Sequence, residues 1–242
     1  RGYAVAINEP IPPNMLDYPK TSLTSATTQS REDIINKVVA NLAKDGWKKG
    51  ECGFMEKVTT VNKKKVTSTI EFSISTGNAP ELARSAELIK EDLAKVGINI
   101  EVKTFEVGNL NQSVIRPRKY DALLFGQIIN NEGDLYAFWH SSQRKDPGLN
   151  VSQYTNAKVD KILEDAWRTI DTEMRVKKYI QFEDEIRKDL PAVFLYSPHF
   201  IYVVSEKLKG FDMDHVASPS DRFANVYSWY TETDNVWKIF AK

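Results

Sequence analysis

Strand-like and helix-like segments alternate between residues 66 and 125, and this alternation constrains the fold more than any other feature of the chain. A period-two apolar pattern predicts a strand, and an apolar pattern at helical spacing predicts a helix. The order strand, helix, strand, helix, strand is typical of a parallel, doubly wound sheet. The predicted strands cover residues 66–74, 98–102 and 120–125, and the predicted helices cover residues 78–97 and 110–115.

The segments before this interval predict a helix and a hairpin. Acidic residues follow Arg31, apolar residues recur at helical spacing, and Gly46 is placed to end the helix. A strand at residues 58–61 then leads into a turn at residues 62–65. The turn carries three successive lysines, which we interpret as a solvated hairpin tip rather than a functional basic patch.

Two further helices are predicted after a loop at residues 126–135. Their apolar stripes recur at helical spacing, the second less regularly, and Pro191 follows the second. The predicted stripes consist of Val159, Ile162, Leu163, Ala166 and Trp167 in the first helix, and of Val176, Tyr179, Ile180, Glu183 and Ile186 in the second.

Composition excludes some classes of function and leaves the domain count open. The 242 residues suit one large domain or two small ones and suffice for a buried core. Lys plus Arg equals Asp plus Glu at 33 each, whereas nucleic-acid binders usually carry a clustered basic excess. Cys52 has no disulfide partner in the chain, and no apolar stretch reaches the length of a membrane span.

A search for catalytic, metal and cofactor motifs gives no positive result. The three histidines are far apart in the sequence, and none has metal-ligand spacing with a Cys or an acid on one helix face. Neither a phosphate-binding glycine motif nor a nucleophile elbow is present. We therefore expect a binding protein that uses no cofactor or metal, and we disfavour a hydrolase.

The segment 120–142 holds the best candidate binding residues. A buried strand ends at Gly126 and is followed by amides, acids and aromatic side chains. In open α/β sheets, ligands collect beyond the carboxyl ends of the strands. A surface loop whose aromatic residues anchor the next helix is the alternative. The candidate ligand-binding residues are Gln127, Asn130, Asn131, Asp134, Tyr136 and Trp139.

Several stretches, in their order along the chain, resemble the family 5 extracellular solute-binding proteins. Those stretches are GYAVAINEPIPPNM, ELARSAELIKEDLAKVGINIEVKTFE, YDALLFGQ with GDLYAFWHSS, and NVSQYTNAKVDKILEDAWRTIDTEMRVKKYIQFEDEIRKDLPAVFLYSP. The resemblance implies an α/β lobe of the type II periplasmic-binding class with a doubly wound mixed sheet. It also implies a non-catalytic, extracytoplasmic, periplasmic or lipid-anchored receptor that closes by a hinge around a solute.

Family members are much longer, so the resemblance implies that the chain is a carboxy-terminal fragment whose amino-terminal lobe lies upstream. Residues 1–30 would form an extended crossing segment and loop, and residues 31–200 the second, ligand-binding lobe. Residues 201–242 would return through the hinge and pack on the missing first lobe. The implied partners are a peptide or other small solute and the permease of an ABC transporter, with no nucleic acid.

In peptide-binding members of the family, an acid after the Gly126 position pairs with the amino terminus of the peptide. Asn130 stands where this acid is often found, and Asp134 follows four residues later; Gln127 replaces a common aromatic residue. The resemblance over nearly the whole chain makes an oligopeptide the expected cargo, whereas these two departures from the pattern of the peptide-binding members point away from it. A nickel chelate, a sugar or another solute, or a sensory or interaction domain with the same fold, remain alternatives.

Overall fold

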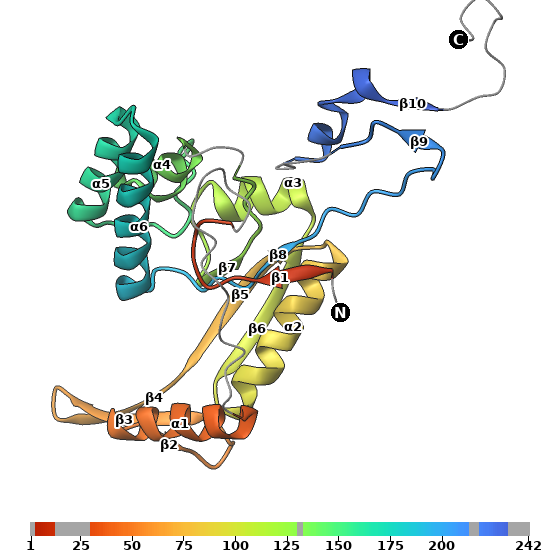
Figure 1. The fold of residues 1–242 in the computed structure, drawn as a ribbon. Coiled ribbons are helices and arrows are strands. Elements are labelled where there is room, and N and C mark those ends of the chain that lie inside the picture. The colour runs from red at the N-terminus through yellow and green to blue at the C-terminus, as the bar shows by residue number, and fades with distance from the viewer. Residues whose placement is uncertain (1–2, 13–29, 130–132, 213–217, 232–242) are drawn as a thin grey trace, which may run out of the picture. The chain divides into compact units, whose positions relative to one another are not determined.

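The computed structural model describes residues 3–12, 30–129, 133–212 and 218–231 (Figure 1). The chain divides into two compact units, which we call the sheet unit and the helical unit. The sheet unit comprises Thr24–Gln127 and Lys145–Pro147, and the helical unit comprises Arg1–Leu23, Ile128–Arg144 and Gly148–Lys242. The segment 31–200, predicted as one lobe, is thus shared between both units, and its boundaries remain a prediction about the intact protein.

A three-stranded parallel sheet forms the centre of the sheet unit, as the alternating pattern predicts. Its strands are β5 (Glu71–Gly77), β6 (Asn99–Phe105) and β7 (Ala122–Leu124), in the order β6-β5-β7. Helix α2 (Pro80–Lys95) connects β5 to β6 and packs on both, because its apolar stripe faces the sheet (Figure 1). The core of this layer contains Ile74, Ala86 and Ile100.

Short helices connect β6 to β7. Helix α3 (Val107–Asn109) continues into a π-helical segment, Leu110–Ile115, which buries Leu110 and Val114. The backbone N–H groups of Gly108 and Asn109 donate to the Glu106 carboxylate, which caps this start. The predicted helix at residues 110–115 is therefore confirmed, in π-helical form.

Helix α1 (Arg31–Lys44) and an antiparallel sheet complete the sheet unit. The sheet has the order β2-β3-β4, with β2 at Lys48–Lys49, β3 at Met55–Val61 and β4 at Lys64–Thr69. The sequence predicted one strand over residues 66–74, which is wrong: the chain leaves the hairpin at Ile70 and enters the parallel sheet. Alternation continues through Ile70, so the pattern carries no sign of the change of sheet.

Three helices form the core of the helical unit: α4 (Gly133–Trp139), α5 (Ala157–Arg168) and α6 (Thr172–Asp189). The α5 stripe is buried as predicted except for Trp167, which is 67% exposed. On α6, Tyr179, Glu183 and Ile186 are buried, but Ile180 is 37% exposed. The largest fully buried side chains here include Leu135, Val159, Leu163 and Phe182.

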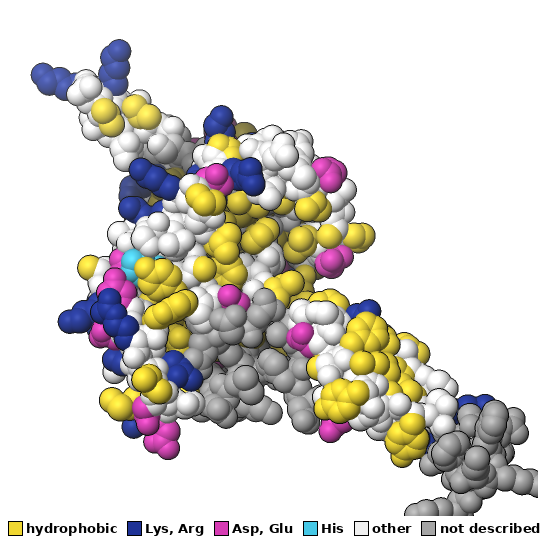
Figure 2. Space-filling view, turned by 90° about the horizontal axis from the view of Figure 1, so that it is seen from above, with side chains coloured by type: hydrophobic (Ala, Val, Ile, Leu, Met, Phe, Trp, Pro, Cys, Tyr) yellow, Lys and Arg dark blue, Asp and Glu magenta, His cyan; other side chains and the backbone are white. Residues whose placement is uncertain are grey.

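The remaining segments of the helical unit are extended or short. Strand β1 (Ala4–Ala6) pairs antiparallel with β8 (Tyr196–Pro198), and β9 (Leu208–Lys209) pairs with β10 (Tyr230–Thr231). Two 3₁₀ helices lie between β9 and β10, at Pro219–Phe223 and Val226–Ser228. Hydrophobic side chains gather over this carboxy-terminal region (Figure 2).

Parallel and antiparallel strands together with helices confirm the predicted α/β class. Among the described residues, none of the helices has the length and apolar character needed to span a membrane.

Candidate functional site

The six predicted binding residues fall into three groups. Gln127 is exposed just after β7, in the sheet unit. Asp134, Tyr136 and Trp139 lie on α4, in the helical unit. They were predicted in a loop or just after it, but Gly133–Trp139 forms a helix. The remaining two, Asn130 and Asn131, lie outside the described residues.

The strand that leads to Gln127 is anchored at both ends. The buried Thr76 hydroxyl donates to the Leu124 carbonyl at 3.0 Å, near the carboxyl end of β7. At the amino end, the Ser73 hydroxyl and backbone N–H donate to Asp121 at 2.7 and 3.0 Å. These hydrogen bonds lower the pKa of the Asp121 carboxyl below its usual value. The sheet thus fixes where the segment bearing Gln127 begins.

Tyr136 stacks on His140, one helical turn further along the chain. The two ring centroids are 4.2 Å apart and the rings are nearly parallel, at 17°. The exposed ring of Trp167 on α5 also contacts the Tyr136 ring, at an interplanar angle of 59° and with the centroids 6.0 Å apart. Tyr136 is half-buried, so part of its ring is accessible to a ligand.

Trp139 packs inside the helical core and is 4% exposed. Its ring contacts Tyr154, Phe182 and Phe194, with centroid distances of 6.3, 6.1 and 5.9 Å. The indole N–H is buried and has no acceptor within the described part of the chain. Its main contribution in this structure is to anchor α4, which agrees with the alternative that the aromatic residues hold a helix.

Asn150 holds the end of α4 in place, a role that the sequence did not indicate. Its side chain is fully buried, and its amide nitrogen donates to the carbonyls of Trp139, His140 and Tyr154 at 3.1–3.3 Å. Its amide oxygen accepts from the Tyr154 backbone N–H at 3.2 Å. One side chain therefore supplies donors to the carbonyls at the end of α4, of which the His140 carbonyl also accepts from the Gln143 backbone N–H.

His140 and the serines after it also act as caps. Nδ1 of His140 accepts from the Ser142 backbone N–H at 3.1 Å, and Asp160 accepts from the Ser141 backbone N–H at 2.8 Å. Nε2 of His140 faces Glu164 at 3.5 Å and Asp160 at 3.9 Å. In the part of the chain that the structure describes, no three His, Cys, Asp or Glu side chains form a group that could hold a metal ion. The cluster therefore fits a structural role at the start of the loop after α4.

The sequence model of a protein family, described as bacterial extracellular solute-binding proteins, family 5 Middle, matches residues 1–148 of the chain. The chain belongs to this family of extracytoplasmic solute-binding proteins, as its sequence motifs indicated. The oligopeptide-binding protein AppA of Bacillus subtilis is 32% identical over 146 residues, which are 60% of this chain and 26% of AppA. The nickel-binding protein NikA of Staphylococcus aureus is 24% identical over 136 residues, 54% of this chain and 26% of that protein.

Solved structures of the family extend the match to nearly the whole chain. Bacillus subtilis AppA in complex with a nonapeptide superposes with a TM-score of 0.70 at 27% identity, covering 96% of this chain and 43% of that one. NikZ of Campylobacter jejuni, in complex with Ni(L-His), gives a TM-score of 0.67 at 24% identity. The match covers 95% of this chain and 44% of NikZ. The chain thus spans less than half the length of these relatives.

Proposed function

We propose that the intact protein captures an oligopeptide without catalysis and delivers it to the permease of an ABC transporter. The observation that carries this proposal is the similarity to AppA, because it combines the family match with coverage of 96% of this chain by a peptide-bound structure. The sequence has neither a phosphate-binding glycine motif nor a nucleophile elbow, which agrees with a binding role. The solute would lie between two hinged lobes of the intact protein.

Asp134 is the proposed partner of the peptide's amino terminus. It lies in the first turn of α4, and an ionised carboxylate forms a strong, charge-assisted bond with an ammonium group when water is excluded. Tyr136 would offer an apolar wall, and Gln127, Asn130 and Asn131 would offer hydrogen bonds. Trp139 would act mainly by fixing the position of α4.

The carboxy-terminal region is the proposed contact with the amino-terminal lobe of the intact protein. Phe200, Ile201, Val203 and Tyr227 are 42%, 60%, 87% and 84% exposed, which is unusual for such large apolar side chains. Arg222 stacks over the rings of Phe200, Tyr202 and Phe223, so this region has an ordered aromatic cluster of its own. An ordered apolar surface is suited to packing on another part of the protein.

Identification of the small molecules that co-purify with the full-length protein tests the proposed cargo. The protein is expressed in a bacterial host, purified without added ligand, and denatured, and the released molecules are identified by mass spectrometry. We expect a set of short peptides. Recovery of a nickel chelate or a sugar, with no peptides, would contradict the peptide proposal and would favour another solute of the same family.

A further inference from the structure

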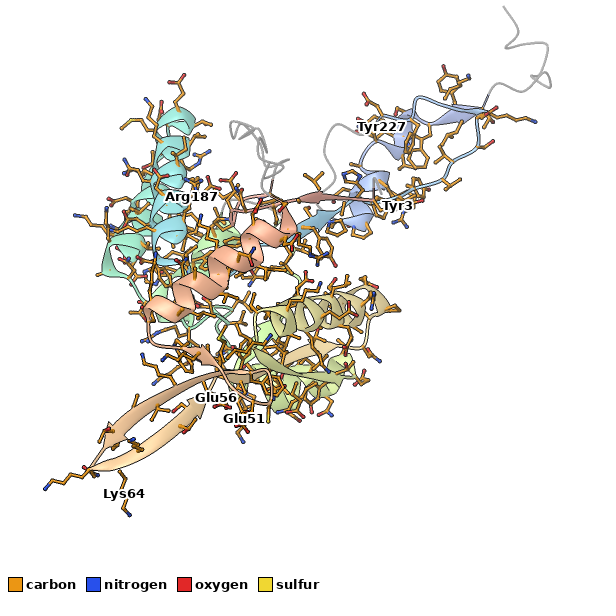
Figure 3. The ribbon with its side chains drawn as sticks, turned by 90° about the horizontal axis from the view of Figure 1, so that it is seen from below. Tyr3, Glu51, Glu56, Lys64, Arg187 and Tyr227 are labelled. Carbon is orange, nitrogen blue, oxygen red and sulfur yellow. The ribbon has the colours of Figure 1, made fainter. Side chains whose placement is uncertain are left out.

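The β3–β4 hairpin carries most of its positive charge at one end. Between Glu56 and Glu71 the sequence has four lysines and neither Asp nor Glu. The three at residues 63–65 are exposed, and none of them forms an ion pair within the described part of the chain. Figure 3 shows Lys64 at the hairpin tip and Glu51 near its base. Charge is therefore separated along the hairpin, with the lysines furthest from the parallel sheet (Figures 1 and 3).

The turn at this tip has a lysine, Lys63, at a position whose left-handed backbone conformation favours glycine. Val61 pairs with Lys64, so the loop has only two residues, Asn62 and Lys63. Their φ angles are 51° and 65°, which is the geometry of a type I′ turn. Glycine at the second position would avoid the strain of a left-handed conformation. Departures from local rules of this kind concentrate at functional sites.

Exposed valines lie beside the lysines. Val61 is 54% exposed and Val66 is 43% exposed. The pairing of Val61 with Lys64 and of Thr59 with Val66 places both valines and Lys64 on one face of the hairpin. Lysine stems are themselves aliphatic, so this face presents apolar groups next to ammonium groups. That combination suits the boundary between lipid headgroups and acyl chains.

We propose that the tip of this hairpin, residues 61–66, binds the anionic phospholipid headgroups of the membrane near which this extracytoplasmic protein works, which replaces the sequence-based interpretation of the three lysines as a solvated tip without a function. Charge complementarity carries the proposal, because Lys63 in the turn and the flanking Lys64 and Lys65, which lie on opposite faces of the hairpin, can all reach a flat anionic surface that the tip meets end-on. An acidic protein surface would need carboxylates arranged around this tip, whereas a lipid surface adapts to it. The contact is separate from solute capture and needs no solute.

Vesicle co-sedimentation of the chain tests the proposal. The probes are vesicles of phosphatidylcholine alone and vesicles of phosphatidylcholine mixed with phosphatidylglycerol. We expect binding to the mixed vesicles only, and a loss of binding at high salt because salt screens exposed charges. Replacing the three lysines at residues 63–65 with glutamine should lower the partition coefficient on the order of a hundredfold, since each lysine near the surface adds about fivefold.

Two further variants separate the tip from net charge and from misfolding. The matched control replaces Lys90, Lys119 and Lys177, which are exposed elsewhere, with glutamine. It removes the same charge and should keep most of the binding. Lys63→Gly suits the turn geometry, so its expected loss of about fivefold in binding cannot come from a disrupted hairpin.

Three results would overturn the proposal. The first is equal vesicle binding by the native chain and the tip variant. The second is an equal loss in the tip variant and the matched control, which would show an effect of net charge alone. The third is tip-dependent binding to soluble polyglutamate without binding to mixed vesicles, which would indicate an acidic protein partner.

Discussion

Apolar side chains of the helical core and of the β3–β4 hairpin are in opposite environments. Leu135, Val159 and Phe182 are completely buried between α4, α5 and α6. Val58 and Val61 of the hairpin are 59% and 54% exposed, and α1 of the same unit buries none of its residues. Both regions carry regular apolar patterns in the sequence.

The difference shows what periodicity does and does not determine. Periodicity fixes which side chains share a face, but burial also requires a second element to cover that face. The helices α5 and α6 cover each other and together with α4 enclose the core. We therefore expect stability to depend mainly on the helical core, and the hairpin to act through its surface.

The largest expected effect comes from Phe182→Ala in the helical core. Removal of a fully buried ring should lower the free energy of unfolding by about 3–5 kcal/mol, through lost burial and a cavity. Val58→Ala in the hairpin is the matched comparison and should cost about 0.5 kcal/mol or less. Urea unfolding followed by circular dichroism measures both. Equal costs would remove the contrast between the two regions.

Asn150→Ala should have the next largest effect. The substitution leaves the buried carbonyls of Trp139 and Tyr154 without the Asn150 donor, whereas the His140 carbonyl keeps the Gln143 N–H and the Tyr154 N–H keeps the Ser152 hydroxyl, so the expected cost is about 1–3 kcal/mol. Hydrogen exchange should also become faster at the end of α4. Ser152→Ala is the control, because the exposed Ser152 hydroxyl makes two hydrogen bonds, donating to Asn150 at 3.0 Å and accepting from the Tyr154 backbone N–H at 3.4 Å, and should matter less. A neutral Asn150→Ala would show that water replaces these bonds.

Lys63→Gly should act in the opposite direction. Relief of the left-handed conformation at the hairpin turn should stabilise the hairpin by about 1 kcal/mol. Slower hydrogen exchange in β3 and β4, with no change in α5 and α6, is the expected result. Lys64→Gly is the matched control and should not stabilise, because Lys64 is already in the strand. Faster exchange in Lys63→Gly would contradict this account of the turn.

The smallest expected effect concerns Asp121 in the sheet unit. Its pKa is lowered by hydrogen bonds from Ser73, so it adds stability above its unfolded-state pKa of about 3.9. That stability is lost as the pH falls through the lower folded-state pKa. Asp121→Asn should therefore be less stable than the native chain at neutral pH, with the difference shrinking in acid. Urea midpoints at several pH values test this, and a constant difference would contradict it.

The sequence predicted the fold best where a helix-starting proline or a helix-ending glycine agrees with the apolar periodicity. Pro80 and Gly97 mark the limits of α2 closely, and the three parallel strands follow from the alternation around it. The split between β4 and β5 was missed, because both strands share one alternating pattern across Ile70. Patterns of this kind do not record which sheet a strand joins.

The candidate site was only partly predictable. The position of Gln127 after β7 follows from the rule for open α/β sheets, but the helix at Gly133–Trp139 was not expected. Trp139 was predicted to contact the ligand because an aromatic side chain in a polar segment is suited to binding. Its burial depends on Tyr154, Phe182 and Phe194, which come from distant parts of the sequence.

Calorimetry on the full-length protein tests the central claim most directly, using one peptide with a free amino terminus and the same peptide acetylated. We expect the free peptide to bind at micromolar levels or better, about −8 kcal/mol. Asp134→Ala should weaken the free peptide at least about tenfold and leave the acetylated peptide nearly unchanged, since acetylation removes the charge. Glu132, an acid two residues before Asp134 in the sequence, is the control, and Glu132→Ala should have less effect. If Asp134→Ala affects both peptides alike, Asp134 is not the amine partner, and a non-peptide cargo becomes the better account.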